Sequence, residues 1–273
     1  MEEFILATII ALTNQKGGVG KTTTSSALAA GLFSFHDKKV LAIDLDPQGS
    51  LGFSLGLDIE NCKTIYDVLT GQVPIKDAIQ ETDYCDIITS NILLSGAELE
   101  FTSSDRDLLL KKALIPVKSN YDYIIIDTPP ALNILTVNAY AASNHLIIPM
   151  APEILSLLGV SQLKETIDSV RQSVNPNLNV LGIILTKFNP RTLLAREVKE
   201  MAENIASQMG TRVFANQIRT SVTVAEAPAH GLSVFDHAPH ANPSLDYQEF
   251  VQEVVTRTSS NIIQGGASNG QEK

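Results

Sequence analysis

The chain has 273 residues, of which 44% are hydrophobic and 18% charged, as in ordinary globular proteins. Asp and Glu number 30 against 20 Lys and Arg, a formal net charge of −10, which excludes an overall attraction to nucleic acid and leaves only local contacts. The sequence has no membrane-spanning apolar run and no basic leader, and its two isolated cysteines indicate neither a disulfide framework nor a zinc site, so we expect a cytoplasmic protein that makes no membrane contact.

Short apolar, β-rich runs alternate with amphipathic segments along the chain, and the spacers are long enough for crossover helices. Several runs are almost entirely apolar, as strands covered on both faces are. The pattern predicts an α/β fold with a mostly parallel sheet and helices on both faces. The predicted strands are 4–12, 39–44, 85–89, 121–127, 145–149 and 179–186, and two predicted helices are 25–33 and 192–208.

Domain boundaries follow from composition. Neither a repeat nor a linker divides the chain, which predicts a single domain over 1–258, and the polar, Gly-rich segment 259–273 is expected to be disordered.

In the helix at 192–208, apolar residues recur at steps of four, three and four and predict one buried stripe. Its members are Leu194, Val198, Met201 and Ile205.

Residues 17–23, GGVGKTT, lie between a predicted strand and a predicted helix, the context that a phosphate loop requires. Glycines let successive backbone N–H groups point at phosphate oxygens, and the helix adds its positive dipole end. We expect Lys21 to reach the β- and γ-phosphates and the Thr22 hydroxyl to bind Mg²⁺. The predicted nucleotide contacts here are Gly17, Gly18, Val19, Gly20, Lys21, Thr22 and Thr23, and the loop departs from the usual pattern by having Gln15 in place of a glycine, followed by an extra lysine, Lys16.

Acidic residues follow two of the predicted strands. AIDLDPQGS (42–50) places Asp44 and Asp46 two residues apart at a strand end, and YIIIDTPP (123–130) ends a buried strand with Asp127. Either feature alone also fits a turn or a helix-capping acid. Histidine and cysteine are absent around these motifs, so the sequence offers no candidate for covalent catalysis.

The stretch KGGVGKT (16–22) resembles the deviant phosphate loop of the ParA, Soj and MinD ATPases. This resemblance, which extends from residue 9 to about 257, implies a three-layer P-loop NTPase fold with ATP and Mg²⁺ as cofactors. It also implies that Lys16 crosses a subunit boundary to the partner's nucleotide, so that ATP holds two subunits together.

The same resemblance assigns roles to the site residues. Lys16, Lys21 and Asp46 would be catalytic, with Asp46 orienting the attacking water. Phosphoryl transfer needs charge neutralisation and a placed water more than covalent chemistry, so slow hydrolysis is expected. The implied magnesium residues are Thr22, Asp44 and Asp127, and the implied adenine contacts are Asn189, Arg219 and Ser221.

Two later matches favour the ParA/Soj branch. LGVSQL (158–163) is similar to the family's helix start at the dimer face, and EAPAHG (226–231) is similar to its EAPSHG stretch. A MinD-like protein would end in a basic amphipathic helix, whereas 259–273 has one basic residue, Lys273. An iron–sulfur relative would have a cysteine shortly after Asp127, where none occurs.

Members of this branch bind DNA without sequence preference when ATP dimerises them. Between 187 and 219 six basic residues stand against three acids, a balance of +3, which is a plausible DNA face but also fits a solvated helix face. Thr220 and Thr223 replace arginines that the family pattern has. The candidate DNA contacts are Arg191, Arg196, Lys199 and Arg219.

The sequence is therefore interpreted as a partitioning ATPase for plasmid or chromosomal DNA, associated with the nucleoid in its ATP state. A ParB-like partner would speed its hydrolysis, and an acidic surface suits a basic partner segment. Two alternatives stay open: a related ATPase that positions a different cargo, and a nucleotide-switched adaptor that scarcely hydrolyses ATP.

Overall fold

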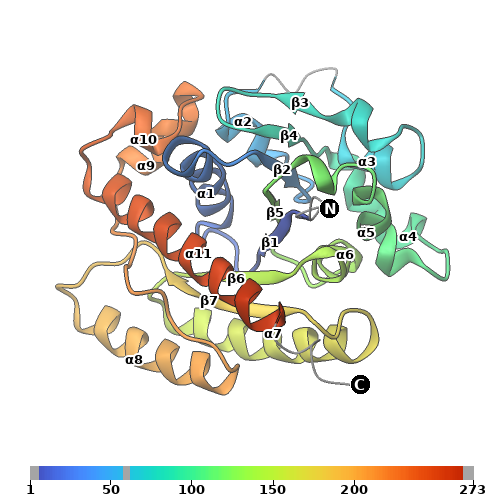
Figure 1. The fold of residues 1–273 in the computed structure, drawn as a ribbon. Helices are drawn as coiled ribbons and strands as arrows, with labels where there is room; N and C mark the ends of the chain where they lie inside the picture. The colour runs from blue at the N-terminus through green and yellow to red at the C-terminus, as the bar shows by residue number, and fades with distance from the viewer. Residues whose placement is uncertain (1–5, 58–61, 267–273) are drawn as a thin grey trace.

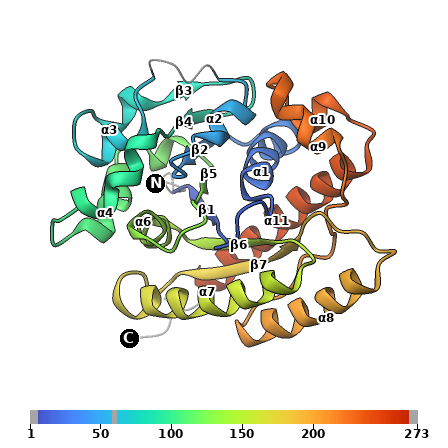
Figure 2. The ribbon, with the colours of Figure 1, turned by 180° about the vertical axis from the view of Figure 1, so that it is seen from behind.

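The computed structural model describes residues 6–57 and 62–266. At its centre is a seven-stranded sheet in the order β3-β4-β2-β5-β1-β6-β7, with helices on both faces (Figure 1, Figure 2). Neighbouring strands are parallel except β3, which is antiparallel to β4. The predicted three-layer α/β fold is confirmed. The strands are β1 (Thr8–Leu12), β2 (Val40–Asp44), β3 (Gln80–Glu81), β4 (Asp86–Ile88), β5 (Tyr123–Asp127), β6 (His145–Met150) and β7 (Asn179–Leu185).

The strands other than β3 bury side chains on both faces, because their alternate residues belong to two separate cores. In β1, Ile10 and Leu12 pack with one group of helices, whereas Ile9 and Ala11 pack with the other. The first group is α1 (Lys21–His36), α2 (Ser50–Ser54), α10 (Val234–His237) and α11 (Asn242–Gly266). The second is α3 (Ile65–Leu69), α5 (Leu109–Leu114), α6 (Ile134–Ala142), α7 (Ile154–Ser173) and α8 (Leu193–Gln208). Two further short helices are α4 (Ala97–Glu100) and α9 (Thr223–Glu226).

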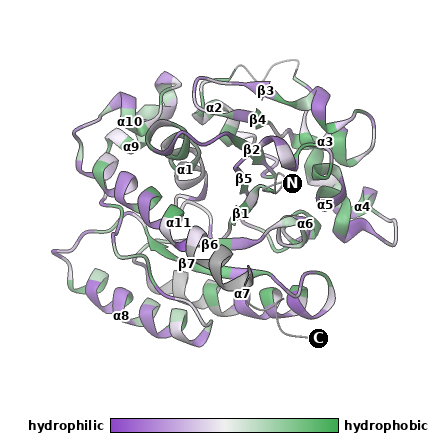
Figure 3. Ribbon diagram, viewed as in Figure 1, coloured by the Kyte–Doolittle hydropathy of each residue, from purple (hydrophilic) through white to green (hydrophobic). Residues whose placement is uncertain are grey.

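Every predicted apolar run contains a strand, but β3 was not predicted because it has only two residues and no apolar pattern. The predicted helix at 25–33 is longer, since α1 begins directly after Gly20, whose φ of 83° is left-handed, and ends before Asp37 at φ 50°. Figure 3 shows how hydropathy is distributed over the fold: the strands inside are hydrophobic, and hydrophilic residues lie on the outward side of α8.

The predicted buried stripe of α8 is wrong for two of its four members. Leu194 and Met201 are 43% and 46% exposed, while Val198 is buried and Ile205 partly buried. α8 packs on α7 and β7 mainly through alanines, whose small side chains allow a close approach, so the larger residues lie at the edge of the contact. The buried residues are Ala195, Val198, Ala202 and Ala206.

The helix α11 extends past residue 259, where the sequence predicts the start of a disordered tail, and ends at Gly266. Between 244 and 264 the segment contains neither proline nor glycine, which allows one continuous helix. The disordered tail stays a prediction. The remainder of the predicted disordered tail, 267–273, lies outside the described residues.

Candidate nucleotide site

The carboxyl ends of the parallel strands open onto a cavity of about 530 Å³, the usual position of ligand sites in open α/β sheets. One wall is the loop between β1 and α1, with Gly17, Gly18, Gly20, Lys21 and Thr22. Asp46 and Pro130 border it from the loops after β2 and β5. The opposite wall is made by Thr186, Lys187, Ile218, Arg219, Thr220, Ser221, Val224, Ala225 and Tyr247.

The phosphate loop has the geometry that its glycines predict. Gly18 and Gly20 adopt left-handed φ values of 73° and 83°, which a residue with a Cβ seldom adopts. The Thr186 hydroxyl fixes the loop by donating a 2.7 Å hydrogen bond to the Val19 carbonyl. Lys21 is 7% exposed, and its ammonium donates to the Lys16 carbonyl at 3.2 Å. Burial lowers the pKa of Lys21, so an anionic ligand would stabilise its charged form.

Asp44 and Asp127 are paired in register at the ends of the adjacent strands β2 and β5, and both are buried. Burial raises the pKa of each carboxyl, and the charge of Asp127 raises that of Asp44 further. Asp127 accepts hydrogen bonds from Thr22 Oγ1 at 2.6 Å and Ser25 Oγ at 2.9 Å. The Lys21 charge acts on Asp127 and partly offsets the repulsion between the two buried acids. The Thr22 hydroxyl and the Asp127 carboxylate lie together and are oxygen ligands of the kind that Mg²⁺ prefers, so they fit a site for this ion.

Asp44 has a second function visible in its contacts. Its two carboxylate oxygens accept the backbone N–H groups of Asp46 and Leu51, each at 2.9 Å. It therefore fixes the turn that carries Asp46 toward the cavity, and direct metal ligation would compete with these two hydrogen bonds. Asp46 itself is half-buried, lines the cavity, and uses one oxygen to accept the Gln48 N–H.

Lys16 does not line this cavity in the described structure. Its ammonium forms an ion pair with the Glu153 carboxylate. Its backbone N–H donates to Asn14 Oδ1 at 3.0 Å, and the Asn14 amide donates to the Pro149 carbonyl at 2.7 Å. The lysine is therefore available at the rim, separate from the cradle around Lys21.

The residues predicted to contact adenine separate into two groups. Arg219 and Ser221 lie on the cavity wall, together with the apolar residues Ile218, Val224 and Tyr247. Asn189 is exposed, is not among the lining residues, and accepts the Arg191 N–H at 3.1 Å. The structure thus brings two of the three to the cavity.

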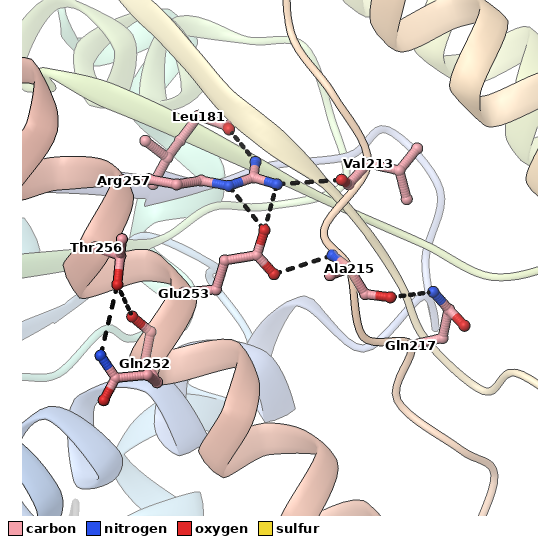
Figure 4. Close-up of polar contacts among 8 residues, drawn as sticks. All are labelled: Leu181, Val213, Ala215, Gln217, Gln252, Glu253, Thr256 and Arg257. Carbon is pink, nitrogen blue, oxygen red and sulfur yellow. Dashed lines mark hydrogen bonds and ion pairs between the residues drawn. The ribbon is translucent and has the colours of Figure 1, made fainter.

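Helix α11 holds the wall segment 213–219 with one polar stripe. Asp246 binds the Arg219 guanidinium at 2.6 to 3.1 Å and its backbone N–H at 3.0 Å. Further along, Glu249 accepts from the Asn216 side chain, and Glu253 accepts the Ala215 N–H. Figure 4 shows the far end of the stripe, where the Arg257 guanidinium donates to the carbonyls of Leu181 and Val213 and pairs with Glu253.

The four residues predicted to contact DNA differ in exposure and in ion pairing. Arg191 and Arg196 are exposed near and on α8, and Lys199 is half-buried on the same helix. Arg219 instead pairs with Asp246, which neutralises its charge locally. Its contact with DNA stays a prediction.

Sequence reasoning missed Ser25, Thr186 and Tyr247. Ser25 follows the phosphate-loop threonines by one helical turn, so helical spacing from Lys21 was a usable signal. Thr186 at the end of a predicted strand was a weaker signal. The sequence around Tyr247, in the C-terminal helix, contains no motif that points to the cavity.

The fold and the site define a P-loop nucleotide-binding protein. A family model described as an AAA domain matches residues 7–180. The chain is 40% identical to the sporulation initiation inhibitor protein Soj of Bacillus subtilis, over 90% of this chain and 98% of that protein. It is 41% identical to the chromosome partitioning protein ParA of Myxococcus xanthus, over 91% and 88%. The chain belongs to the ParA/Soj family of partitioning ATPases, which confirms the resemblance predicted from its sequence.

Solved structures agree with this assignment. Apo McdA from Cyanothece superposes with a TM-score of 0.82 at 26% identity, covering 91% of this chain and 99% of that one. Cobyrinic acid a,c-diamide synthase from Mycobacterium smegmatis, crystallised with an ATP analog and magnesium, has a TM-score of 0.81 at 33% identity, over 94% and 97%.

Proposed function

We propose that this protein is a Mg²⁺-dependent ATPase that partitions plasmid or chromosomal DNA, dimerising with ATP and hydrolysing it slowly. The observation that carries the proposal is the single cluster of Lys21, Thr22, Asp46 and Asp127 around the cavity, with Lys16 at its rim. Similar structures that contain an ATP analog or ADP with magnesium support the choice of ligand.

In the proposed reaction, water attacks the γ-phosphorus, and the bond to the bridging oxygen breaks to give ADP and phosphate. Lys21 binds the phosphate oxygens as charge shifts toward the leaving group, and Asp46 orients the water. Thr22 and Asp127 would hold Mg²⁺, which would neutralise phosphate charge. Lys16 is assigned to the nucleotide of a second subunit.

We assign the DNA contact to the exposed basic residues around α8, chiefly Arg191 and Arg196. A dimer doubles this patch, which offsets the unfavourable net charge of −10. The net negative charge of the chain supports the proposed encounter with a basic segment of a ParB-like partner, which would accelerate hydrolysis. Association with the nucleoid in the ATP state follows from the DNA contact. Among the described residues, no helix is long and apolar enough to cross a membrane.

The proposal is tested by titrating labelled duplex DNA with the protein plus a non-hydrolysable ATP analogue, ADP or no nucleotide, at about 50 and about 200 mM salt. Binding is expected only with the analogue and should weaken steeply with salt. The double variant Arg191→Ala, Arg196→Ala should bind less tightly and with a shallower salt slope, while Arg106→Ala, at an exposed position in the short turn before α5 that packs on α6, should match the wild type. Equal DNA binding in all three nucleotide states contradicts the proposal.

The two alternatives predict different outcomes. An adaptor would bind ATP but show no turnover with any partner, whereas the proposed enzyme hydrolyses ATP, faster with a ParB-like protein and DNA. An ATPase for another cargo would hydrolyse ATP without stimulation by a centromere-binding protein. Its cargo protein would provide the stimulation instead.

A further inference from the structure

The ion pair between Lys16 and Glu153 links two loops at the rim of the nucleotide site. Lys16 belongs to the loop after β1, and Glu153 is the residue directly before α7. The Asn14 side chain joins the loop after β1 to the end of β6 by donating to the Pro149 carbonyl, and its amide oxygen accepts the Lys16 N–H. The backbone of Lys16 is thus fixed on one side by Asn14, and its ammonium is directed toward α7.

This contact is accessible and replaceable. The side chains of Lys16 and Glu153 are 27% and 57% exposed, so water reaches the pair and weakens it. A triphosphate carries several negative charges against the single charge of Glu153, and would attract the ammonium more strongly at the same distance. Lys16 therefore has a weak partner on its own subunit and a stronger one in the proposed dimer.

We propose that Glu153 is a positioning residue that holds Lys16 on its own subunit until the triphosphate of a second subunit displaces it. The inference rests on the proposed function, because it concerns the lysine that is assigned to cross between subunits. Dimerisation then exchanges one ion pair for another in each subunit. Glu153 raises the ATP and protein concentrations at which the dimer forms, and it keeps nucleotide-free subunits apart.

Removing the Glu153 charge should change the dimer dissociation constant by a modest but measurable factor. An exposed pair of this kind changes an equilibrium by roughly threefold, and two pairs break per dimer, so Glu153→Gln should lower the dimer dissociation constant by about tenfold. Screening by salt should reduce this difference, whereas a loss of packing would not respond to salt in this way. Glu153→Asp keeps the charge on a side chain one methylene shorter and should give an intermediate constant.

The experiment is sedimentation velocity of full-length protein with a non-hydrolysable ATP analogue and Mg²⁺, over a range of protein concentrations at low and high salt. The matched control is Glu165→Gln, which removes the same charge from an exposed position on α7. We expect tighter dimerisation for Glu153→Gln alone, with a thermal melt confirming that the variants are folded.

The outcomes separate this inference from the proposed function. If the wild type dimerises and Glu153→Gln has the same or a weaker dimer, the role of Glu153 is overturned and the dimerising ATPase stands. The same conclusion follows if Glu165→Gln tightens the dimer equally, because net charge would then be the cause. If the wild type stays monomeric with the analogue, both proposals fail.

Discussion

The three aspartates at the strand ends have the same side chain in three different environments. Asp44 accepts hydrogen bonds from backbone N–H groups, and Asp127 accepts them from the hydroxyls of Thr22 and Ser25. Asp46 is half-buried and lines the cavity. Of the three aspartates, Asp46 is the one that lines the cavity, so we assign it the role of orienting a water there. The division of roles proposed for them follows from these contacts.

Changing Asp46 to alanine should lower ATP turnover by at least about 100-fold while ATP still binds, because it removes the group that orients the attacking water and leaves the phosphate loop intact. Steady-state hydrolysis and nucleotide titration measure the two quantities separately. Asp83→Ala, at an exposed position away from the cavity, serves as the control. Unchanged turnover in Asp46→Ala would rule out its catalytic role.

His145, at the start of β6, predicts a pH dependence of stability. Burial lowers the pKa of its imidazole from 6.5 to about 4, and its Nδ1 lacks a hydrogen-bond partner among the described residues. The folded protein therefore holds the neutral ring. Its contribution is fully present above pH 6.5 and falls by up to about 3 kcal/mol as the pH decreases from 6.5 to 4, since the unfolded state gains the proton.

Urea unfolding of the wild type and of His145→Phe, measured between pH 7.5 and 4.5, checks this effect. Subtracting the two curves cancels the titration of the other groups. The free energy of unfolding of the variant should decrease less with falling pH than that of the wild type. Parallel curves would show that His145 titrates alike in the folded and unfolded states.

Residues in the phosphate loop could be predicted because their spacing along the chain is itself the structural requirement. Lys21 and Thr22 lie where the motif places them, and Asp44 and Asp127 meet because parallel strands end at one edge of the sheet. Asn189 and Arg219 could not be placed in this way. The Asn189 side chain is held by a local turn, in which it accepts the Arg191 N–H, and the Arg219 side chain is directed by Asp246, 27 residues further along the chain.

At the scale of elements, α11 connects the nucleotide cavity to the far edge of the sheet. Arg257 is 8% exposed, lies 3.9 Å from the centre of the Phe214 ring, and binds carbonyls on two other segments. These contacts determine the register of segment 213–219, whose end forms the cavity wall. We expect the wall to be displaced when they are lost.

Arg257→Met should therefore reduce the free energy of unfolding by about 2 to 4 kcal/mol, because Glu253 and two carbonyls lose their partner. It should also weaken ATP binding by about tenfold by displacing the wall. Arg171→Met on α7, which loses a hydrogen bond to the Leu178 carbonyl away from the cavity, should lose about 1 kcal/mol of stability. Its ATP affinity should equal that of the wild type; equal affinity in Arg257→Met would refute the coupling.

Elements with strong periodicity were predictable, and their packing partners were not. The strands other than β3, and helix α8, are present where apolar patterns predict them. A prediction from hydrophobicity alone favours burial of the larger Leu194 and Met201. In the structure α8 buries mainly its alanines, because close packing against neighbouring elements favours small side chains. The stripe of α11 escaped prediction for a related reason, since Asp246 and Arg219 are 27 residues apart and neither belongs to a motif.

For the whole molecule, an acidic protein that binds DNA must present its cations on one surface and in more than one copy. The basic residues around α8 and the net charge of −10 make a lone subunit a poor DNA ligand. Dimerisation by ATP would double the patch without changing any contact within a subunit. In the proposed dimer, Lys16 is the residue that joins the two subunits.

The most direct test compares sedimentation of the wild type, Lys16→Ala and Lys21→Ala with a non-hydrolysable ATP analogue and Mg²⁺. We predict that the wild type becomes a dimer, that Lys16→Ala binds the analogue and stays monomeric, and that Lys21→Ala fails to bind it. A Lys16→Ala protein that dimerises with the analogue as tightly as the wild type would contradict the account.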